Sequence, residues 1–160
     1  MDTEFKPTFK RVLTVTIPGK PQAVQSVKIR RFGKFAKAYQ PEKVVNWKMF
    51  VKLIASEAVS GIENWVPLDG ALAVRFTYVF PPLKSMPKKL QQFIADGGTV
   101  LKITKPDLTD NLNKGVCDGL SGVVWSDDCR VAITGNSIKK YGTVPQTVVH
   151  IYKIEGVYVY

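Results

Sequence analysis

The sequence predicts a single α/β domain of the α+β kind, in which helices cover a mixed sheet. The chain has 160 residues, the size of one ordinary domain. Strand-like and helix-like segments alternate along it, with no repeat or linker to divide them. A hydrophobic fraction of 45% and a charged fraction of 22% are typical of a folded protein. We expect the domain to span residues 1–160, with 1–10 and 156–160 peripheral to it.

The first half of the chain predicts two strands and a helix. Residues 11–19 alternate apolar and polar side chains and stop at Pro-Gly, which is typical of a strand. Residues 26–41 predict a second, very basic strand or hairpin around Gly33. Residues 41–59 predict an amphipathic helix. Its apolar residues at helical spacing are Val44, Trp47, Val51, Ile54 and Ala58.

The second half predicts a denser alternation of elements. Residues 71–80 form a strong strand pattern closed by two prolines, and residues 86–98 predict a short helix that ends at two glycines. The rest is expected to run as a strand (99–104), a helix (110–120) and strands at 122–125, 129–136 and 143–154. The closing IEGVYVY is either an extra edge strand or a partner surface.

The charge distribution points to a polyanionic partner. The chain carries a formal charge of +10, and residues 5–40 contain nine Lys or Arg and no acid. Such a stretch suits a phosphate backbone, whose counterions are released on binding. The alternative is a solvated basic surface kept for solubility. The candidates for contact with DNA are Lys28, Arg30, Arg31, Lys34 and Lys105.

Several classes of protein are disfavoured by what the sequence lacks. No apolar run reaches the roughly 20 residues that span a bilayer, and the N-terminus does not resemble a signal peptide. We therefore expect a cytoplasmic protein without membrane partners. Cys117 and Cys129 form no CxxC pair, and His150 is the only histidine, which disfavours a zinc site or a catalytic triad.

The acidic residues are concentrated in one segment. Five of the thirteen, Asp107, Asp110, Asp118, Asp127 and Asp128, fall within residues 105–128. Leu112, Val116 and Leu120 recur every four residues and should face the core. Asp127 and Asp128 follow an apolar run that ends at Trp125. If that run packs beside the helix, Asp107, Asp110 and Asp128 assemble a carboxylate pocket, with Asp127 adjacent.

A pocket of this kind needs a cation, because carboxylates held together repel one another. Oxygen ligands suit Mg²⁺ or Mn²⁺, and such a metal within a basic protein can activate water to cut a phosphodiester. Lys114, one turn after Asp110, is placed to contact the scissile phosphate or the leaving oxygen. The alternative is structural: Asp110, Lys114 and Asp118 form an i, i+4 salt-bridge ladder, and Asp127-Asp128 is only a turn.

The segment KPDLTDNLNKGVCDGLSGVVWSDDCRV resembles the signature of RusA-type Holliday junction resolvases: KPD-x-DNL-x-K, a D-[AG]-L helix end and a W/Y-x-DD turn. The segments VTIPGKP, AYQPEK, LAVRFTYVFPPLKS and KKYG-x-x-P are also similar to the family, so the likeness covers roughly residues 13–155. The resemblance implies a homodimeric, Mg²⁺-dependent endonuclease that makes paired symmetric nicks in four-way DNA junctions. Such proteins are common in phages and prophages.

By this resemblance the catalytic carboxylates match Asp107, Asp110 and Asp128, the essential lysine matches Lys114, and Asp127 supports them. One departure stands out: Leu108 and Thr109 both separate the first two aspartates, where the family has one residue. We place the insertion before Asp110. Two other readings remain open: a catalytically silent DNA-binding protein of the same fold, and a related nuclease that prefers other branched or flapped DNA.

Overall fold

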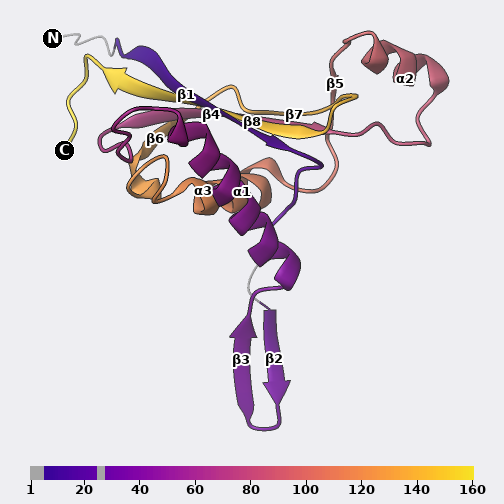
Figure 1. Cartoon of the computed structure of the whole chain (residues 1–160). Helices are drawn as coiled ribbons and strands as arrows, with labels where there is room; N and C mark the ends of the chain where they lie inside the picture. Colours follow the sequence, from indigo (N-terminus) through magenta and orange to yellow (C-terminus); the bar gives the residue numbers. More distant parts are fainter. Residues whose placement is uncertain (1–5, 25–27) are drawn as a thin grey trace, which may run out of the picture.

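In the computed structural model, which describes residues 6–24 and 28–160, two helices pack on one face of a mixed sheet (Figure 1). The strands are β1 (Thr8–Pro18), β2 (Lys28–Phe32), β3 (Phe35–Tyr39), β4 (Leu72–Phe80), β5 (Val100–Leu101), β6 (Val131–Thr134), β7 (Ile138–Tyr141) and β8 (Gln146–Glu155). The α-helices are α1 (Glu42–Ser60), α2 (Lys88–Ala95) and α3 (Asn113–Leu120). The fold class predicted from the sequence is confirmed.

Strand β4 is the centre of the sheet. One of its edges pairs antiparallel with β8, which pairs in turn with β1. The other edge pairs in parallel with two short strands in succession, β6 and then β7. Between them the Ser137 hydroxyl accepts the Phe76 N–H at 3.1 Å, so the ladder continues across the break. The inner face of β4 is buried along its whole length, whereas Arg75 on the outer face is exposed.

Helices α1 and α3 close the core against the inner face of the sheet. The helical side chains Val44, Trp47 and Val51 are buried, as predicted, whereas Ile54 and Ala58 are partly buried at the edge of the core. The α3 stripe predicted to face inward does so. Its members Leu112, Val116 and Leu120 are fully buried. Because the sheet and both helices share one apolar cluster, α3 has a fixed position over β4.

Two predicted strands differ in the structure. The strand predicted at 99–104 is reduced to β5, because the chain leaves the sheet at Lys102 to reach the Pro106 turn. The run 122–125 is not a strand but a turn with isolated bridges. Its buried Val124 and Trp125 fill the core from that turn, which explains why an apolar run was mistaken for a strand. Strand β7 was not predicted, and residues 156–160 extend no strand.

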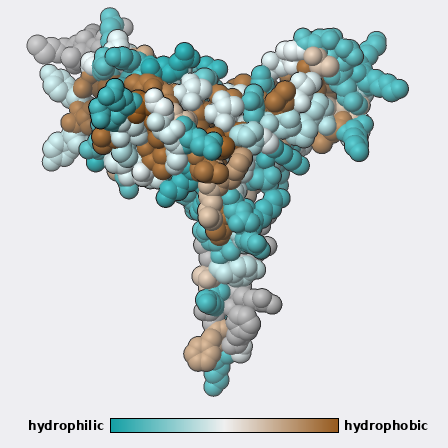
Figure 2. Space-filling model, in the orientation of Figure 1, coloured by the Kyte–Doolittle hydropathy of each residue, from teal (hydrophilic) through white to brown (hydrophobic). Residues whose placement is uncertain are grey.

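Two segments project from the body (Figure 1). Strands β2 and β3 form the predicted hairpin, which stands away from the sheet as an arm. The arm has a mostly hydrophilic surface where side chains are described, as Figure 2 shows. The second projection carries α2 between β4 and β5. Neither projection contributes much to the core, so their sequences are free to serve surface roles.

Helix α3 approaches α1 closely because two of its residues are glycines. A Cβ at Gly119 would lie 2.6 Å from the Cβ of Val51 and 3.0 Å from the carbonyl oxygen of Lys48. A Cβ at Gly115 would overlap Val24. Next to this contact, Lys48 Nζ and Asp118 Oδ2 form an ion pair at 2.5 Å. The glycines therefore set the distance between the helices, and the ion pair stabilises their register.

We expect Gly119→Ala to destabilise the protein. Although alanine is the better helix former, its methyl group would overpack a β-branched side chain and a backbone carbonyl, which typically costs about 1–3 kcal/mol. Urea denaturation measures the change. Gly61→Ala is the matched control, because a Cβ there meets nothing within 4 Å. A Gly119→Ala variant as stable as the wild type would show that α1 and α3 do not pack this closely.

Candidate active site

The residue inserted between the first two aspartates is accommodated by a π-helical turn at Leu108–Leu112. The N–H of Leu112 bonds to the carbonyl of Asp107 at 3.1 Å, and the N–H of Asn113 bonds to the carbonyl of Leu108. Each bond spans five residues, so the turn encloses one residue more than an α-turn does. Leu112 is thus kept in the core despite the insertion, and the register after Asp110 is that of an uninterrupted helix.

The start of α3 is fixed to the sheet by a buried hydrogen bond. The hydroxyl of Tyr78, on β4, donates to Asn113 Oδ1 at 2.7 Å. Burial raises the pKa of Tyr78 well above its ordinary value, so the phenol remains a donor. From the other side, the N–H of Val24 bonds to the carbonyl of Asn111 at 3.1 Å. Lys114 follows directly after this anchor, with its side chain exposed, so its backbone is held while its ammonium reaches solvent.

Asp128 is oriented by the core. Its Oδ1 accepts the indole N–H of Trp125 at 2.8 Å, and the Trp125 ring is fully buried. The turn that carries this tryptophan is tied on both sides to Leu68, whose N–H bonds to Val124 and whose carbonyl accepts from Ser126. A buried ring thus positions an exposed carboxylate, which is how a rigid scaffold orients a functional group at its surface.

Asp127 has a local structural role. Its Oδ1 accepts the N–H of Cys129 at 2.8 Å and caps the short 3₁₀ helix Asp128–Arg130. This bond lowers the pKa of the Asp127 carboxyl, and a side-chain hydrogen bond with Asp127 raises the pKa of the Cys129 thiol. Beyond it, Arg130 Nε pairs with Asp69 at 2.7 Å. The first aspartate of the pair therefore holds the turn, and Asp128 is the one free to serve a site.

The carboxylate pocket predicted from the sequence is not assembled. Within the described residues, no group of three or more His, Cys, Asp or Glu side chains is arranged to hold a metal ion. Three of the four aspartates have local hydrogen-bond partners instead. Asp107 accepts from the side-chain amide of Asn111 at 3.2 Å, while Asp128 accepts from Trp125 and Asp127 from Cys129. Asp107 and Asp110 are both exposed in the π-turn region and Asp128 is exposed after the core turn.

The salt-bridge ladder considered as an alternative is also absent from the described residues. Asp118 pairs with Lys48 of α1 rather than with Lys114. Lys114 forms no ion pair among the described residues. The charges of α3 therefore serve different partners: Asp118 stabilises the helix contact, and Lys114 stays available to a ligand.

Lys139 is the residue that the sequence analysis missed. From β7, its ammonium donates to the carbonyls of Thr104 and Pro106, both at 2.6 Å. These carbonyls flank the cis Lys105-Pro106 bond and immediately precede Asp107. Burial and the nearby Lys102 lower the pKa of Lys139, while Asp107 raises it. Lys139 thus holds the backbone that presents Asp107. The likeness of KKYG to the family was the only signal for it in the sequence.

The residues predicted to contact DNA fall in two places. Arg31 and Lys34 are exposed on the β2–β3 arm, and Lys105 is exposed beside Asp107. Lys28 and Arg30 have described backbone positions in β2, but their side chains lie outside the described part of the structure. The basic residues therefore occur both on the projecting arm and next to residues 107–112, which contain Asp107 and Asp110 and which we call the acidic turn.

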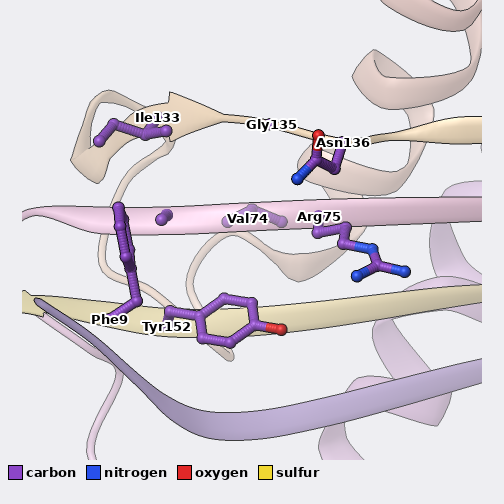
Figure 3. A pocket seen from close by; sticks show the side chains of 8 residues that line it. Phe9, Val74, Arg75, Ile133, Gly135, Asn136 and Tyr152 are labelled. Atoms are coloured by element: carbon purple, nitrogen blue, oxygen red, sulfur yellow. The ribbon is translucent and has the colours of Figure 1, made fainter.

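A separate hollow of about 270 Å³ lies on the other side of β4, between β6 and β8 (Figure 3). Phe9 and Ile133 line one end of it, and the Arg75 guanidinium and the Tyr152 hydroxyl lie toward the other. No carboxylate and no predicted site residue lines it. It therefore lacks the groups for metal or acid–base chemistry, and the acidic turn remains the candidate active site.

Asp128 acts electrostatically on Cys117 of α3. Burial, with Asp128 and Asp118, raises the pKa of the Cys117 thiol to about 12. We expect Asp128→Asn, in a Cys129→Ser background, to lower that pKa and accelerate iodoacetamide alkylation of Cys117, because the thiolate is the reactive form. Asp96→Asn, on α2, is the control. An alkylation rate unchanged by Asp128→Asn would show that the Asp128 carboxylate does not face α3.

Comparison with known proteins agrees with the resemblance seen in the sequence. The sequence model of the family described as Endodeoxyribonuclease RusA matches residues 18–152, which include every residue of the acidic turn and β4 to β7 in full. No curated protein matches the chain significantly. Among the described residues, no helix is long and apolar enough to cross a membrane. The match covers most of the chain, which therefore belongs to the RusA family of endodeoxyribonucleases.

Proposed function

We propose that this protein is a Mg²⁺-dependent endodeoxyribonuclease that resolves four-way DNA junctions by paired symmetric nicks. Family membership supplies the reaction class. The observation that carries the proposal is the π-turn, which keeps Leu112 in the core and holds Asp107, Asp110 and Lys114 on one continuous helix start despite the inserted residue. A turn of this kind is frequent at functional sites.

The donor set suits a hard divalent cation. Asp107, Asp110 and Asp128 offer only carboxylate oxygens, which Mg²⁺ and Mn²⁺ prefer. All three side chains are exposed, so rotation about their side-chain bonds can redirect them without repacking the core. These three residues would hold the ion, with Asp127 as a supporting neighbour. When bound, the ion would supply a nucleophilic hydroxide and stabilise charge on the phosphate.

The chain's own residues account for the remaining requirements. Lys114 would place its ammonium against the scissile phosphate or the leaving oxygen, since it is exposed one turn beyond Asp110 and unpaired among the described residues. Trp125 orients Asp128, and Lys139 orients the backbone before Asp107. Arg31 and Lys34 on the arm, with Lys28, Arg30 and Lys105, would neutralise phosphates of the junction arms.

We further infer that the protein works as a homodimer, because a four-way junction has two-fold symmetry and two opposed strands to cut. The resemblance to resolvases supports a phage or prophage origin, action in the bacterial cytoplasm, and a role in DNA recombination and repair.

The proposal predicts that Asp110→Asn and Asp128→Asn each abolish cleavage of a synthetic four-way junction while binding is retained. Loss of a second-sphere partner of a metal typically costs about 10- to 100-fold, so loss of a ligand should cost at least about 100-fold. Gel assays with Mg²⁺ measure cleavage, and fluorescence anisotropy in EDTA measures binding. Asp69→Asn is the control, since the Asp69 carboxylate bonds to Arg130 and Ser126 and is not among the proposed ligands. Cleavage by either variant at the wild-type rate would exclude that carboxylate from catalysis.

Among the described residues no carboxylate group is assembled to hold a metal ion, which favours a second candidate, a catalytically silent junction-binding protein of the same fold. Deleting Thr109 discriminates the two, because it shortens the spacing from Asp107 to Leu112 from five positions to four and should convert the π-turn to an α-turn. If the proposed nuclease is correct, the wild type cuts junctions with Mg²⁺ and the deletion variant also cuts. A wild type that binds junctions but cuts only after the deletion would establish the silent protein.

The same assay should include a flap and a linear duplex beside the junction. We expect the junction to be cut fastest. Faster cutting of the flap would identify instead a nuclease of the same lineage with a different branched substrate.

A further inference from the structure

A groove lined by four lysines runs up to the acidic turn. Lys20, Lys84, Lys102 and Lys105 line it together with the rings of Phe80 and Tyr141, around a volume of about 320 Å³. We call it the lysine groove. Its walls contain no carboxylate. Among the described residues, none of the four lysines forms an ion pair with an acid, so their charges are uncompensated by the protein.

The groove is built by the paired ends of β4 and β7. Phe80 and Tyr141 are register partners there. The ammonium of Lys102 lies 5.3 Å from the centre of the Phe80 ring and 5.5 Å from that of Tyr141, and it contacts the Thr104 hydroxyl at 2.5 Å. Two aromatic faces and a hydroxyl therefore hold one cation in place, whereas Lys20 and Lys84 at the rim are exposed.

The groove adjoins the candidate active site through the backbone. Lys105 and Pro106 belong to its wall, and Asp107 is the next residue. Lys139 fixes this wall by its bonds to Thr104 and Pro106. A ligand that occupied the groove would therefore lie next to the backbone that carries Asp107. The clustered like charges repel one another, and an anionic ligand would relieve that repulsion.

We propose that the lysine groove binds the phosphodiester backbone of the DNA strand next to the phosphate that is cut. This inference rests on the proposed nuclease function and assigns Lys20, Lys84 and Lys102 to substrate binding. The groove has the size of a small-ligand pocket, which admits the backbone of one strand rather than a whole duplex. Each lysine that neutralises a phosphate releases counterions, so its contribution depends on salt.

The test is the salt dependence of junction binding by Lys20→Gln/Lys84→Gln, measured by anisotropy in EDTA so that cleavage is not required. A slope of about 0.9 per neutralised phosphate predicts that the plot of log affinity against log salt becomes shallower by about 2. The control is Lys52→Gln/Lys153→Gln. It removes the same charge from exposed positions on α1 and at the far end of β8 and should keep the wild-type slope.

A second arm of the test locates the contact. Replacing one phosphate next to the cut with an uncharged methylphosphonate should weaken binding by the wild type and by the control, but not by Lys20→Gln/Lys84→Gln. Equal slopes for the two double variants, or equal sensitivity to the methylphosphonate, would overturn the groove assignment even if the wild type cuts junctions. A wild type that binds but does not cut would instead refute the nuclease proposal. The salt-dependence slopes would then still show whether the lysine groove binds the DNA backbone.

Discussion

The docking of α3 against both the sheet and α1 is the constraint on which the rest of the site depends. Leu112, Val116 and Leu120 are fully buried over β4, and Gly119 allows the backbone of α3 to approach Val51 of α1. Once this position is fixed, residues 107–111 must connect Lys105-Pro106 to the helix. The residues after Leu120 must form the turn that contains Trp125. The acidic residues lie at the two places where the chain enters and leaves this helix.

That constraint explains the π-turn. An insertion in a helix start would rotate the following residues by about 100°, and Leu112 would then leave the core at a cost of roughly 2–3 kcal/mol. A hydrogen bond from the N–H of Leu112 to the carbonyl of Asp107, five residues earlier, avoids this by widening a single turn. The wider turn lies before the core stripe, so Leu112, Val116 and Leu120 all remain buried.

The sequence was informative where periodicity and burial agree. The apolar spacing of α1 and α3 and the alternation of β1 and β8 predicted these elements, because each has one face in the core. Periodicity failed at Val124 and Trp125, which are buried from a turn, and at the four-residue β7, which is too short to show a pattern. For the site, the sequence led to a prediction of which carboxylates act, but it gave no sign of their hydrogen-bond partners. The contacts of Lys139 and the lysine groove join residues far apart in the chain, and no local pattern encodes them.

The charges of the molecule follow a division that suits a nuclease acting on DNA. Basic side chains extend along the arm and line the groove, while Asp107, Asp110, Asp127 and Asp128 lie in the segments before and after α3. The central claim is that Asp107, Asp110 and Asp128 come together on one divalent ion. The most direct measurement is the anomalous scattering of Mn²⁺ in crystals of the protein grown with this ion. The account predicts one or more Mn²⁺ peaks within coordination distance of all three carboxylates. Well-ordered carboxylates with no peak among them, or a peak elsewhere only, would contradict it.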